Sequence, residues 1–448
     1  MTTSILAKKS LLIVFTYAPA GLGHLRVTDA LYHGLPTGVT PVLLGAQDTS
    51  VGVIHRIMSI HPILRRIMEW AQRGTPENVF TYFYRRQLRA NTKLLYQQMV
   101  TILSQRLEVP TTVLIIATHF GLAHQLAAIK ERLSKTLKIT MILVVQVTDD
   151  SPQRMWYVDG ADVIFVPSEL TKQELSRYAT QAGLPPVTFA VAPYPVSPLL
   201  SKPLTESERA YRLRQSDGKS QSAIHVTVPI SGAAVGTDFM RDLMDELFAR
   251  SHRFIFHVIC KSAPFTEIFV KEMSERPYVK LLVSTHGREV VSQHELLYRR
   301  VCIGFEITKP SEQAFKALLP TSSVGGSILL FSQPVGRQEY DNLAFLTRHK
   351  LIPNAREQQK LFQRINEESS KPVTFKDETK KWRGLLLPND PKDAAHFFIR
   401  CLTKGVFTSM LTHNEWNKQT IDNDEVRSDG VHIFWKKVEE IVASDKSG

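Results

Sequence analysis

Residues 11–24 read LLIVFTYAPAGLGH. An apolar run of strand length, Leu11–Phe15, leads into a turn that contains Gly21 and Gly23, and a helical pattern follows through Asp29-Ala30-Leu31. Glycines let a backbone approach a ligand closely, and the N-terminus of a helix offers unpaired N–H groups to an anion. A simple tight turn explains the same residues, so both interpretations stay open. The turn lacks the third glycine of the dinucleotide-binding fingerprint.

The same alternation of strand and helix continues along the chain. Further apolar runs of strand length lie at 113–117, 139–147, 163–166, 188–191, 223–229, 254–260, 279–283 and 328–331. Helical patterns separate several of these runs, which predicts an α/β protein with parallel sheets covered by helices on both faces. A polar stretch rich in Pro, Ser, Arg and Lys divides the runs into two groups. We therefore expect one domain over residues 1–195, a linker over 196–222 and a second domain over 223–448 that ends in helices; the helical pattern at Asp390–Thr403 could return to the first domain.

The composition fits a globular protein of more than one domain. The chain has 448 residues, of which 43% are hydrophobic and 22% charged, and three are cysteines. So few cysteines exclude a disulfide framework, and their spacing offers no zinc knuckle. The formal net charge of +12 favours an acidic or phosphate-bearing partner, or an anionic surface. No apolar stretch approaches the roughly 20 residues needed to span a bilayer, and we expect a cytoplasmic protein, with a place on the inner face of a membrane as an option.

A second turn of the same kind follows the apolar run that ends at Pro229. It reads ISGAAVGTD over residues 230–238 and leads into a helical pattern through Met240–Ala249. Two glycines and two hydroxyls at this place, Ser231, Gly232, Gly236 and Thr237, predict an anion-binding loop at the carboxyl end of a strand. Capping of the helix by Thr237 or Asp238 is the structural alternative, and it is compatible with phosphate binding.

Two more motifs lie farther along the chain. Lys309 and Pro310 follow an apolar run in Ile307-Thr308-Lys309-Pro310. Gln338, Glu339 and Asn342 form a carboxylate–amide set that could hold sugar hydroxyls, although an ordinary polar surface explains these residues equally well.

Taken together, the motifs resemble a family of glycosyltransferases: the monogalactosyldiacylglycerol synthases, the diacylglycerol glucosyltransferases and the peptidoglycan lipid N-acetylglucosaminyltransferase. The family's G-G-G-H followed by Ala-Leu resembles Gly21-Leu22-Gly23-His24 with Ala30-Leu31, and its diphosphate loop resembles Ser231–Gly236. Its T-D, Trp, Asp and V-P-S series resembles Thr148-Asp149, Trp156, Asp162 and Val166-Pro167-Ser168. Its I-T-K-P-G-G resembles Ile307–Pro310, and its Q-E-x-x-N resembles 338–342. The ordered set covers residues from about 15 to 345.

The chain also departs from the family at several positions. The family's His and the Pro after it, just before the tryptophan, are Gln153 and Arg154 here. Where the family has two glycines after Lys-Pro, this chain has Ser311 and Glu312, and Arg337 replaces the family's glycine before Gln-Glu. Where the family has an acidic residue that holds the nucleotide ribose, this chain has Lys316. These changes lie mainly in the donor half and allow a different nucleotide or a loss of catalysis.

The resemblance implies a GT-B fold, that is, two Rossmann-like doubly wound domains that face each other across a cleft. It implies a hexosyltransferase-type enzyme that moves a hexose or N-acetylhexosamine from a nucleotide-sugar, with UDP as the favoured nucleotide, to an acceptor such as a membrane lipid. The displacement would be inverting and would need no metal and no cofactor beyond the donor substrate. His24 has the intrinsic pKa of a general base, and Asp149 could be that base or orient it. Gly21, Gly23 and Trp156 would form the acceptor-side loop. The donor would be held by Ser231, Gly232, Gly236, Thr237, Lys309, Pro310, Gln338, Glu339 and Asn342.

A basic, aromatic-rich segment spans residues 51–106. It holds nine basic residues against two acidic ones, interleaved with many large apolar side chains. This pattern is typical of an amphipathic segment that rests on an anionic membrane, and in the resembled lipid glycosyltransferases the region faces the bilayer. A charged insert packed on its own domain is the alternative, and no recognised motif supports nucleic-acid binding. The expected membrane-facing residues are Arg65, Arg66, Trp70, Phe83, Arg85 and Arg86.

Two other functions remain open. A catalytically silent protein with the same fold, which still binds nucleotide-sugars, would explain the changes in the donor half. A sugar-nucleotide epimerase on this fold would need acidic residues and histidines in the second domain, where His225, His257, His286 and His294 are available. The sequence does not distinguish between oligomeric states.

Overall fold

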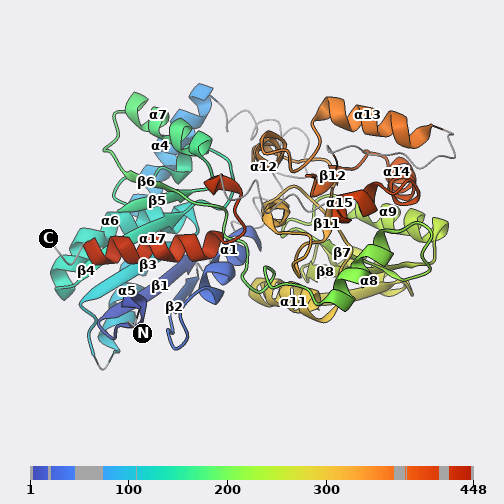
Figure 1. The fold of residues 1–448 in the computed structure, drawn as a ribbon. Helices are drawn as coiled ribbons and strands as arrows, with labels where there is room; N and C mark the ends of the chain where they lie inside the picture. Colours follow the sequence, from blue (N-terminus) through green and yellow to red (C-terminus); the bar gives the residue numbers. More distant parts are fainter. Residues whose placement is uncertain are drawn as a thin grey trace. The chain divides into compact units, whose positions relative to one another are not determined.

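The computed structural model describes residues 4–18, 22–45, 74–106, 108–367, 379, 381–412 and 423–444. The chain forms two compact units (Figure 1). The first unit comprises Met1–Ser197 together with Asp429–Gly448, and the second unit comprises Pro198–Ser428.

The first unit is built on a parallel sheet of six strands in the order β2-β1-β3-β4-β5-β6. The chain starts this sheet at β1, adds β2 on one side and then adds every later strand on the other side. The order of the strands therefore reverses between β1 and β3, which is where open parallel sheets bind ligands at their carboxyl ends. The strands are β1 (Leu11–Tyr17), β2 (Val42–Gly45), β3 (Thr112–Ala117), β4 (Thr140–Gln146), β5 (Val163–Val166) and β6 (Thr188–Val191).

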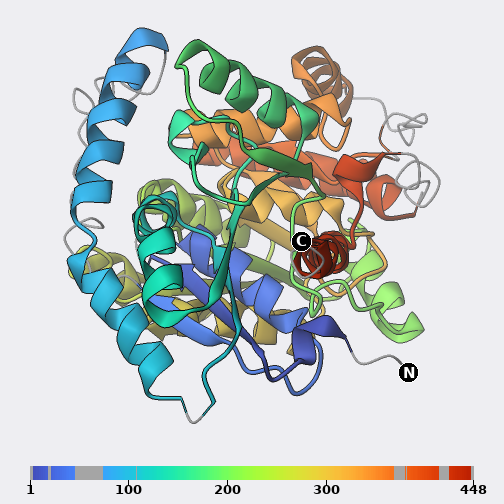
Figure 2. The ribbon, with the colours of Figure 1, turned by 90° about the vertical axis from the view of Figure 1, so that its left-hand side faces the viewer.

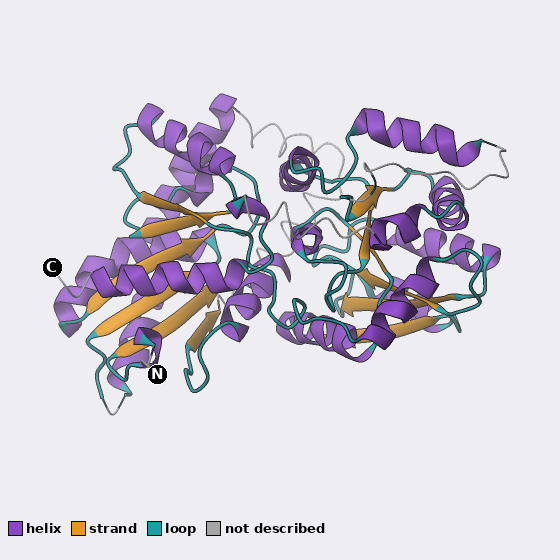
Figure 3. Cartoon of the chain, viewed as in Figure 1, coloured by secondary structure: helices purple, strands orange, loops and turns teal. Residues whose placement is uncertain are grey.

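Helices cover both faces of this sheet (Figure 3). One face packs on α5 and α6 through a continuous apolar core that includes Val14, Ile115 and Leu143. α4 and α5 follow one another along one side of the unit (Figure 2). The helical elements are η1 (Ile5–Ala7), α1 (Leu22–His33), α4 (Gly74–Ala90), α5 (Lys93–Ser104), α6 (Phe120–Leu137), η2 (Arg154–Trp156), α7 (Glu169–Gln181) and α17 (Gly430–Ser444).

The second unit repeats this plan with another parallel six-stranded sheet, in the order β12-β11-β10-β7-β8-β9. Its strand order reverses between β7 and β10. The strands are β7 (Ile224–Pro229), β8 (Phe254–Lys261), β9 (Val279–Ser284), β10 (Phe305–Thr308), β11 (Ile328–Phe331) and β12 (Gly384–Leu386). The structure confirms the expected α/β class with two Rossmann-like doubly wound domains, which are the two domains of a GT-B fold.

One face of the second sheet carries the larger apolar core, in which Val226, Phe256 and Phe305 pack on α9, α14 and α15. The helical elements of this unit are α8 (Glu206–Ser216), α9 (Thr237–Arg250), α10 (Glu267–Ser274), α11 (Gly287–Arg300), η3 (Glu312–Leu318), α12 (Arg337–Arg348), α13 (Ala355–Asn366), α14 (Pro391–Thr403), α15 (Val406–Thr412) and η4 (Asp424–Val426).

The unit boundaries differ from the expected domains at the linker. Residues 196–222 contain α8, which begins with a capping box at Thr205 and Glu208. The Arg212 side chain of this helix is buried and donates hydrogen bonds to the carbonyls of Ile303, Thr321, Ser323 and Val324. From Pro198 onward, this stretch is therefore an ordered part of the second unit.

The C-terminus also departs from the expected domain of 223–448. α17 lies along the sheet of the first unit (Figure 1), where Trp435 Nε1 donates to the carbonyl of Leu31 at 2.9 Å and the rings of Phe434 and Phe165 lie 4.6 Å apart. The returning helix is thus α17, whereas α14 packs on α9 within the second unit. Val431, Val438 and Val442 on α17 are buried as well, so an amphipathic helix at the very end of the chain completes the first unit.

Candidate functional site

The loop between β7 and α9 has the backbone that its glycines predict. Ala234 and Gly236 both adopt left-handed conformations, with φ of 50° and 83°. Gly236 is the N-cap of the 14-residue helix α9 and has no side chain that could bond to the first N–H groups of the helix. Such an arrangement presents backbone N–H groups together with the positive end of the helix dipole.

Lys309 joins this loop from the neighbouring strand, β10. Its side chain is 8% exposed, and its Cε lies 3.8 Å from the position that a Cβ would take on Gly236. Its Nζ lies 3.8 Å from a carboxylate oxygen of Glu339 on α12, and Glu339 also accepts the N–H of Val335 at 2.5 Å. The buried Asn342 side chain donates to the carbonyl of Pro310 at 3.2 Å. Three motifs that lie far apart in the sequence therefore meet at the carboxyl edge of the second sheet, where its strand order reverses.

The remaining predicted donor residues lie in the same elements. Ser231 and Gly232 are half-buried in the loop, Thr237 opens α9, and Gln338 is half-buried in the first turn of α12.

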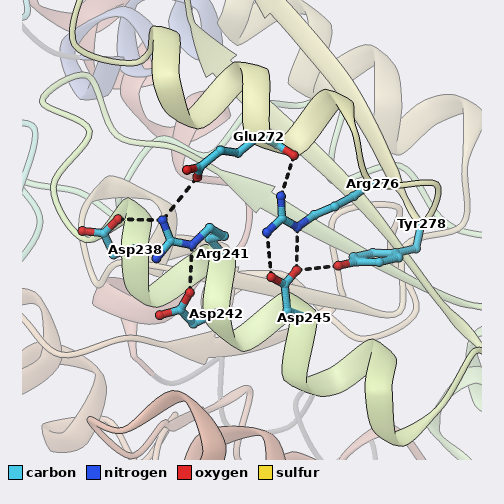
Figure 4. Close-up of polar contacts among 7 residues, drawn as sticks. All are labelled: Asp238, Arg241, Asp242, Asp245, Glu272, Arg276 and Tyr278. Atoms are coloured by element: carbon cyan, nitrogen blue, oxygen red, sulfur yellow. Dashed lines mark hydrogen bonds and ion pairs between the residues drawn. The ribbon is translucent and has the colours of Figure 1, made fainter.

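α9 is held in place by a charged network (Figure 4). Arg241 bridges three carboxylates, those of Asp238 and Asp242 on its own helix and that of Glu272 on α10. One turn farther on, Asp245 pairs with Arg276 and accepts a hydrogen bond from the Tyr278 hydroxyl. These contacts fasten α9 to α10 and to the residue just before β9, which fixes where the helix N-terminus lies.

Lys316, at the position where the resembled family has an acidic residue, lies in the protein interior. It is 3% exposed and forms an ion pair with Glu306 of β10, which is fully buried. The Tyr298 hydroxyl donates to the same carboxylate at 2.6 Å, and His294 Nε2 lies 3.4 Å from it. Burial alone would raise the pKa of Glu306, but the charge of Lys316 and the contacts of His294 outweigh it and lower this pKa to about 2. Lys316 therefore stabilises the sheet rather than facing a ligand.

The histidines considered for an epimerase do not gather at the loops of the second unit. His225 Nδ1 and His257 Nε2 lie 3.0 Å apart on adjacent strands, and burial lowers the pKa of His257 to about 3. His294 belongs to the buried cluster around Glu306, and His286 is exposed at the start of α11. Among the described residues of the second unit, the positions of these histidines give no support to an epimerase site.

In the first unit, the predicted residues His24 and Trp156 lie close together. His24 sits in the first turn of α1, half-buried, and its Nδ1 is 3.2 Å from the Thr148 hydroxyl beyond β4. The Trp156 ring is fully buried and its centroid lies 6.1 Å from that of His24. Asp149 is half-buried next to Thr148, Gly23 is half-buried in α1, and Gly21 lies outside the described residues.

The structure adds a histidine that the sequence analysis did not consider. His119 follows β3, and its ring meets that of His24 edge to face with centroids 5.0 Å apart. The sequence carried a signal for it, because His119 comes two residues after the apolar run 113–117 and so had to lie near the same sheet edge as His24.

The basic segment is described only from residue 74 onward, so Arg65, Arg66 and Trp70 lie outside the described residues. The prediction that Arg85 faces a membrane is wrong, because its side chain is buried and paired with Asp159. Arg86 and Phe83 are exposed on the opposite face of α4. That outer face is apolar and aromatic; Val79, Phe80, Tyr82 and Phe83 are between 48% and 64% exposed.

Within the described part of the chain, no helix is both long and apolar enough to cross a membrane. No group of three or more His, Cys, Asp or Glu side chains among these residues is placed to hold a metal ion.

No family model matches the sequence, and no curated protein matches it significantly. Among solved structures, Arabidopsis thaliana UGT89C1 complexed with UDP-L-rhamnose is similar at 13% identity and a TM-score of 0.46, with 97% of this chain and 98% of that chain covered. The S. aureus MnaA–UDP co-structure gives 9% identity and 0.45, with 94% and 93% covered. The UDP-GlcNAc 2-epimerase from Neisseria meningitidis bound to UDP-GlcNAc gives 10% and 0.44, with 96% and 99% covered. Similarity at this level does not indicate a function. The assignment of the fold depends on the strand order of the two sheets.

Proposed function

We propose that this chain is a nucleotide-sugar-dependent glycosyltransferase whose second unit binds the diphosphate of a UDP-sugar. One observation carries the proposal: the buried side chain of Lys309 lies 3.8 Å from the Cβ position of Gly236, at the start of α9. A glycine-bearing loop, a helix N-terminus and a lysine cation are the three features that together favour a diphosphate. Gln338 and Glu339 in the first turn of the adjoining helix would then bind the sugar hydroxyls, and the buried Asn342 would hold the backbone at Pro310 in place.

The chemistry follows from this arrangement. In an inverting displacement the acceptor oxygen attacks the anomeric carbon, the bond from that carbon to the diphosphate oxygen breaks, and the nucleoside diphosphate leaves with the electron pair. The N-terminus of α9 and Lys309 would offset the negative charge that develops on the leaving group.

The first unit supplies the acceptor half of the proposal. The Thr148 hydroxyl lies 3.2 Å from Nδ1 of His24 and orients this ring, and the imidazole would take the proton of the acceptor hydroxyl. Asp149 is next to Thr148 in the chain and would assist it. Gly23 at the start of α1 and Trp156 in η2 would lie beside the acceptor.

A membrane lipid is the acceptor that the surface of the first unit favours. The aromatic face of α4 carries an arginine, Arg86, and exposed Lys93 and Leu94 follow at the start of α5. An apolar, aromatic surface with basic residues and no exposed acidic residue on α4 suits the interface of an anionic bilayer, where Phe and Tyr enter the headgroup region and cations meet the lipid charge.

The direct test measures UDP binding to a Gly236→Val variant by isothermal calorimetry and thermal shift. A β-branched side chain disfavours φ of 83° and would project at the place where the diphosphate is expected. Gly405→Val is a matched control, since Gly405 has φ of 77° and open space around its Cβ position but lies outside the loop. Both variants should lose similar stability, and only Gly236→Val should lose the stabilisation by UDP.

Equal UDP affinity in folded Gly236→Val and Gly405→Val would exclude the loop as the diphosphate site. Stabilisation by UDP without sugar transfer to any lipid or soluble acceptor would favour the catalytically silent alternative.

A further inference from the structure

The helix α4 carries two different surfaces on opposite faces. On its inner face, Glu77, Thr81 and Arg85 are buried, and their spacing of four residues places them in one row along the helix. Its outer face carries the exposed aromatic side chains that suit an anionic lipid surface. Anything that binds to the outer face therefore acts on the same helix that makes the inner contacts.

The first turn of α4 is bonded to Arg154, the residue that begins η2. The backbone N–H of Arg154 donates to Glu77 Oε1 at 3.0 Å, and Nε of its guanidinium lies 3.6 Å from Glu77 Oε2. The guanidinium also donates to the side-chain oxygen of Asn78. Glu77 is 6% exposed, so water screens this ion pair less than a pair on the surface.

The second half of α4 is bonded to Asp159. Arg85 pairs with the Asp159 carboxylate, and Arg89 donates to the Asp159 carbonyl at 2.9 Å. Residues 154–159, here called the Trp156 segment, are therefore fastened to α4 at both ends. The segment runs along the helix from its first turn to its last.

The contacts of Arg154 are a feature of this chain. The resembled family has proline at this position, and proline has neither a backbone N–H nor a charged side chain. It could make neither the hydrogen bond to Glu77 nor the ion pair with it. The attachment of this end of the Trp156 segment to α4 therefore does not follow from the resemblance.

The Trp156 segment also lies at the acceptor side of the proposed site. The Trp156 ring is buried, with its centroid 6.1 Å from that of His24 and 5.5 Å from that of Phe120. His24 is the proposed base. A change in the position of the Trp156 segment therefore changes the surroundings of this base.

We infer that Arg154 is a positioning residue that joins the Trp156 segment to α4, so that binding of an anionic lipid surface to α4 is transmitted to the acceptor side. The inference rests on the proposed function, in which α4 faces lipid, and it deepens that function by naming the link between the lipid surface and the site. A segment that is bonded to α4 opens less often once a ligand holds α4 in place.

Amide hydrogen exchange of the full chain, followed by mass spectrometry, tests this with vesicles of equal parts phosphatidylglycerol and phosphatidylcholine. The amides of Trp156 and Tyr157 donate to the carbonyls of Gln153 and Arg154, so their exchange reports opening of the segment. A ligand that binds only the closed form slows exchange by a factor close to its concentration divided by its Kd. With lipid at about ten times its Kd, α4 and the Trp156 segment should both exchange roughly tenfold more slowly.

The variant Arg154→Pro removes the contacts with Glu77 while the backbone can keep its course. Gln153 is extended, with ψ of 129°, which suits a residue before proline, and proline is tolerated in the first turn of a helix. The segment stays attached to α6, because His124 Nε2 lies 3.0 Å from the carbonyl of Met155.

Vesicles should slow exchange in α4 of Arg154→Pro as in wild type, whereas most of the slowing in the Trp156 segment should be lost. Arg154→Gln keeps the backbone N–H and should give an intermediate result. Lys130→Gln is the matched control, because it removes an ion pair between α6 and Asp162 without touching α4, and it should respond like the wild type.

Two results would overturn the inference alone. One is that vesicles slow exchange in α4 of the wild type but not in the Trp156 segment, and the other is that they slow the segment equally in wild type and Arg154→Pro. Slowing in neither region would contradict the lipid surface of the proposed function and the inference with it. Stabilisation by UDP is measured in parallel and should be equal in wild type and Arg154→Pro. Its absence from both would contradict only the donor half of the proposed function.

Discussion

Replacing Lys316 by Met should destabilise the second unit strongly, although the change removes only one charge. Lys316 forms an ion pair with Glu306, a carboxylate with no exposed surface. Without the lysine this carboxylate keeps the Tyr298 hydroxyl at 2.6 Å and His294 at 3.4 Å, but it loses the charge that offsets its burial. Breaking a buried ion pair on one side costs about 3–5 kcal/mol, because the remaining charge is left buried and uncompensated.

The pKa of Glu306 gives a similar magnitude. It falls from an ordinary 4.5 to about 2 in the folded chain, which corresponds to on the order of 3 kcal/mol. Because the folded pKa is the lower one, this stability is present above pH about 4.5 and is lost as the pH falls from about 4.5 towards 2. In Lys316→Met the direction of the Glu306 pKa shift should reverse. Burial should then raise the pKa of Glu306, and the penalty should shrink as the pH falls and the carboxyl takes up a proton.

Amide hydrogen exchange of the full chain, followed by mass spectrometry, measures this locally. Peptides from β10 and α11 should open with a free energy lower by about 3–5 kcal/mol in Lys316→Met at pH 7. Adding Glu306→Gln should recover most of the loss, since a neutral amide needs no counter-charge. Lys135→Met is the matched control, because the Lys135–Glu131 pair is 81% and 87% exposed and such pairs contribute about 0–1 kcal/mol. If Lys316→Met is no less stable than the control, or if the double variant is as unstable as the single one, the pair does not hold the strand in place and the reasoning is wrong.

Three further predictions concern the first unit. Arg85→Gln should destabilise the first unit by a few kcal/mol, because the half-buried Asp159 carboxylate then pairs with Arg89 alone. The control Arg86→Gln, on the exposed face of α4, should change the free energy of unfolding by less than about 0.5 kcal/mol in denaturant titrations. Phe83→Ser should weaken binding to vesicles of anionic lipid without changing thermal stability, and equal sedimentation with vesicles for wild type and variant would argue against a lipid-facing α4. His24→Ala should lower sugar transfer by roughly 10²–10⁴-fold and leave UDP affinity unchanged in calorimetry, whereas full transfer activity would show that His24 is not the base.

The sheets could be predicted from the sequence wherever a strand is apolar on both faces. The runs at 11–15, 139–147 and 254–260 became β1, β4 and β8 with shifts of one or two residues at their ends. The strands that the sequence analysis missed have physical reasons for being missed. β2 and β12 are short edge strands, and β10 carries Glu306 in its centre. A charge in a central strand hides the apolar pattern, and it is tolerated only because Lys316 pairs with it.

The charged helix α4 shows what residue patterns alone cannot decide. Its arginines predict a basic outer surface, yet the structure turns Arg85 inward and leaves Phe80 and Phe83 outside. The deciding partner is Asp159, which lies 74 residues farther along the chain. Sequence reasoning assigns charges to the surface by default, and that default fails where two opposite charges from distant segments are buried together.

Site residues could be predicted from the sequence where the sheet topology alone fixes their position, and not where contacts between distant segments decide it. Both glycine turns follow the first strand of a parallel sheet whose order reverses beside that strand, so the topology places Gly23 and Gly236 at the ligand-binding edges of their units whatever their neighbours are. Lys309 directly follows β10, the strand on the other side of the reversal, but this strand was missed from the sequence, and only the family resemblance grouped Lys309 with the loop. The position of His119 follows from the same rule applied to β3, but its significance does not. That depends on Gly121, which leaves room for the ring, and on the contact with the His24 ring, which only the packed structure shows. Topology thus indicates where a ligand binds, whereas the side-chain contacts at that place follow only from the packing of distant segments.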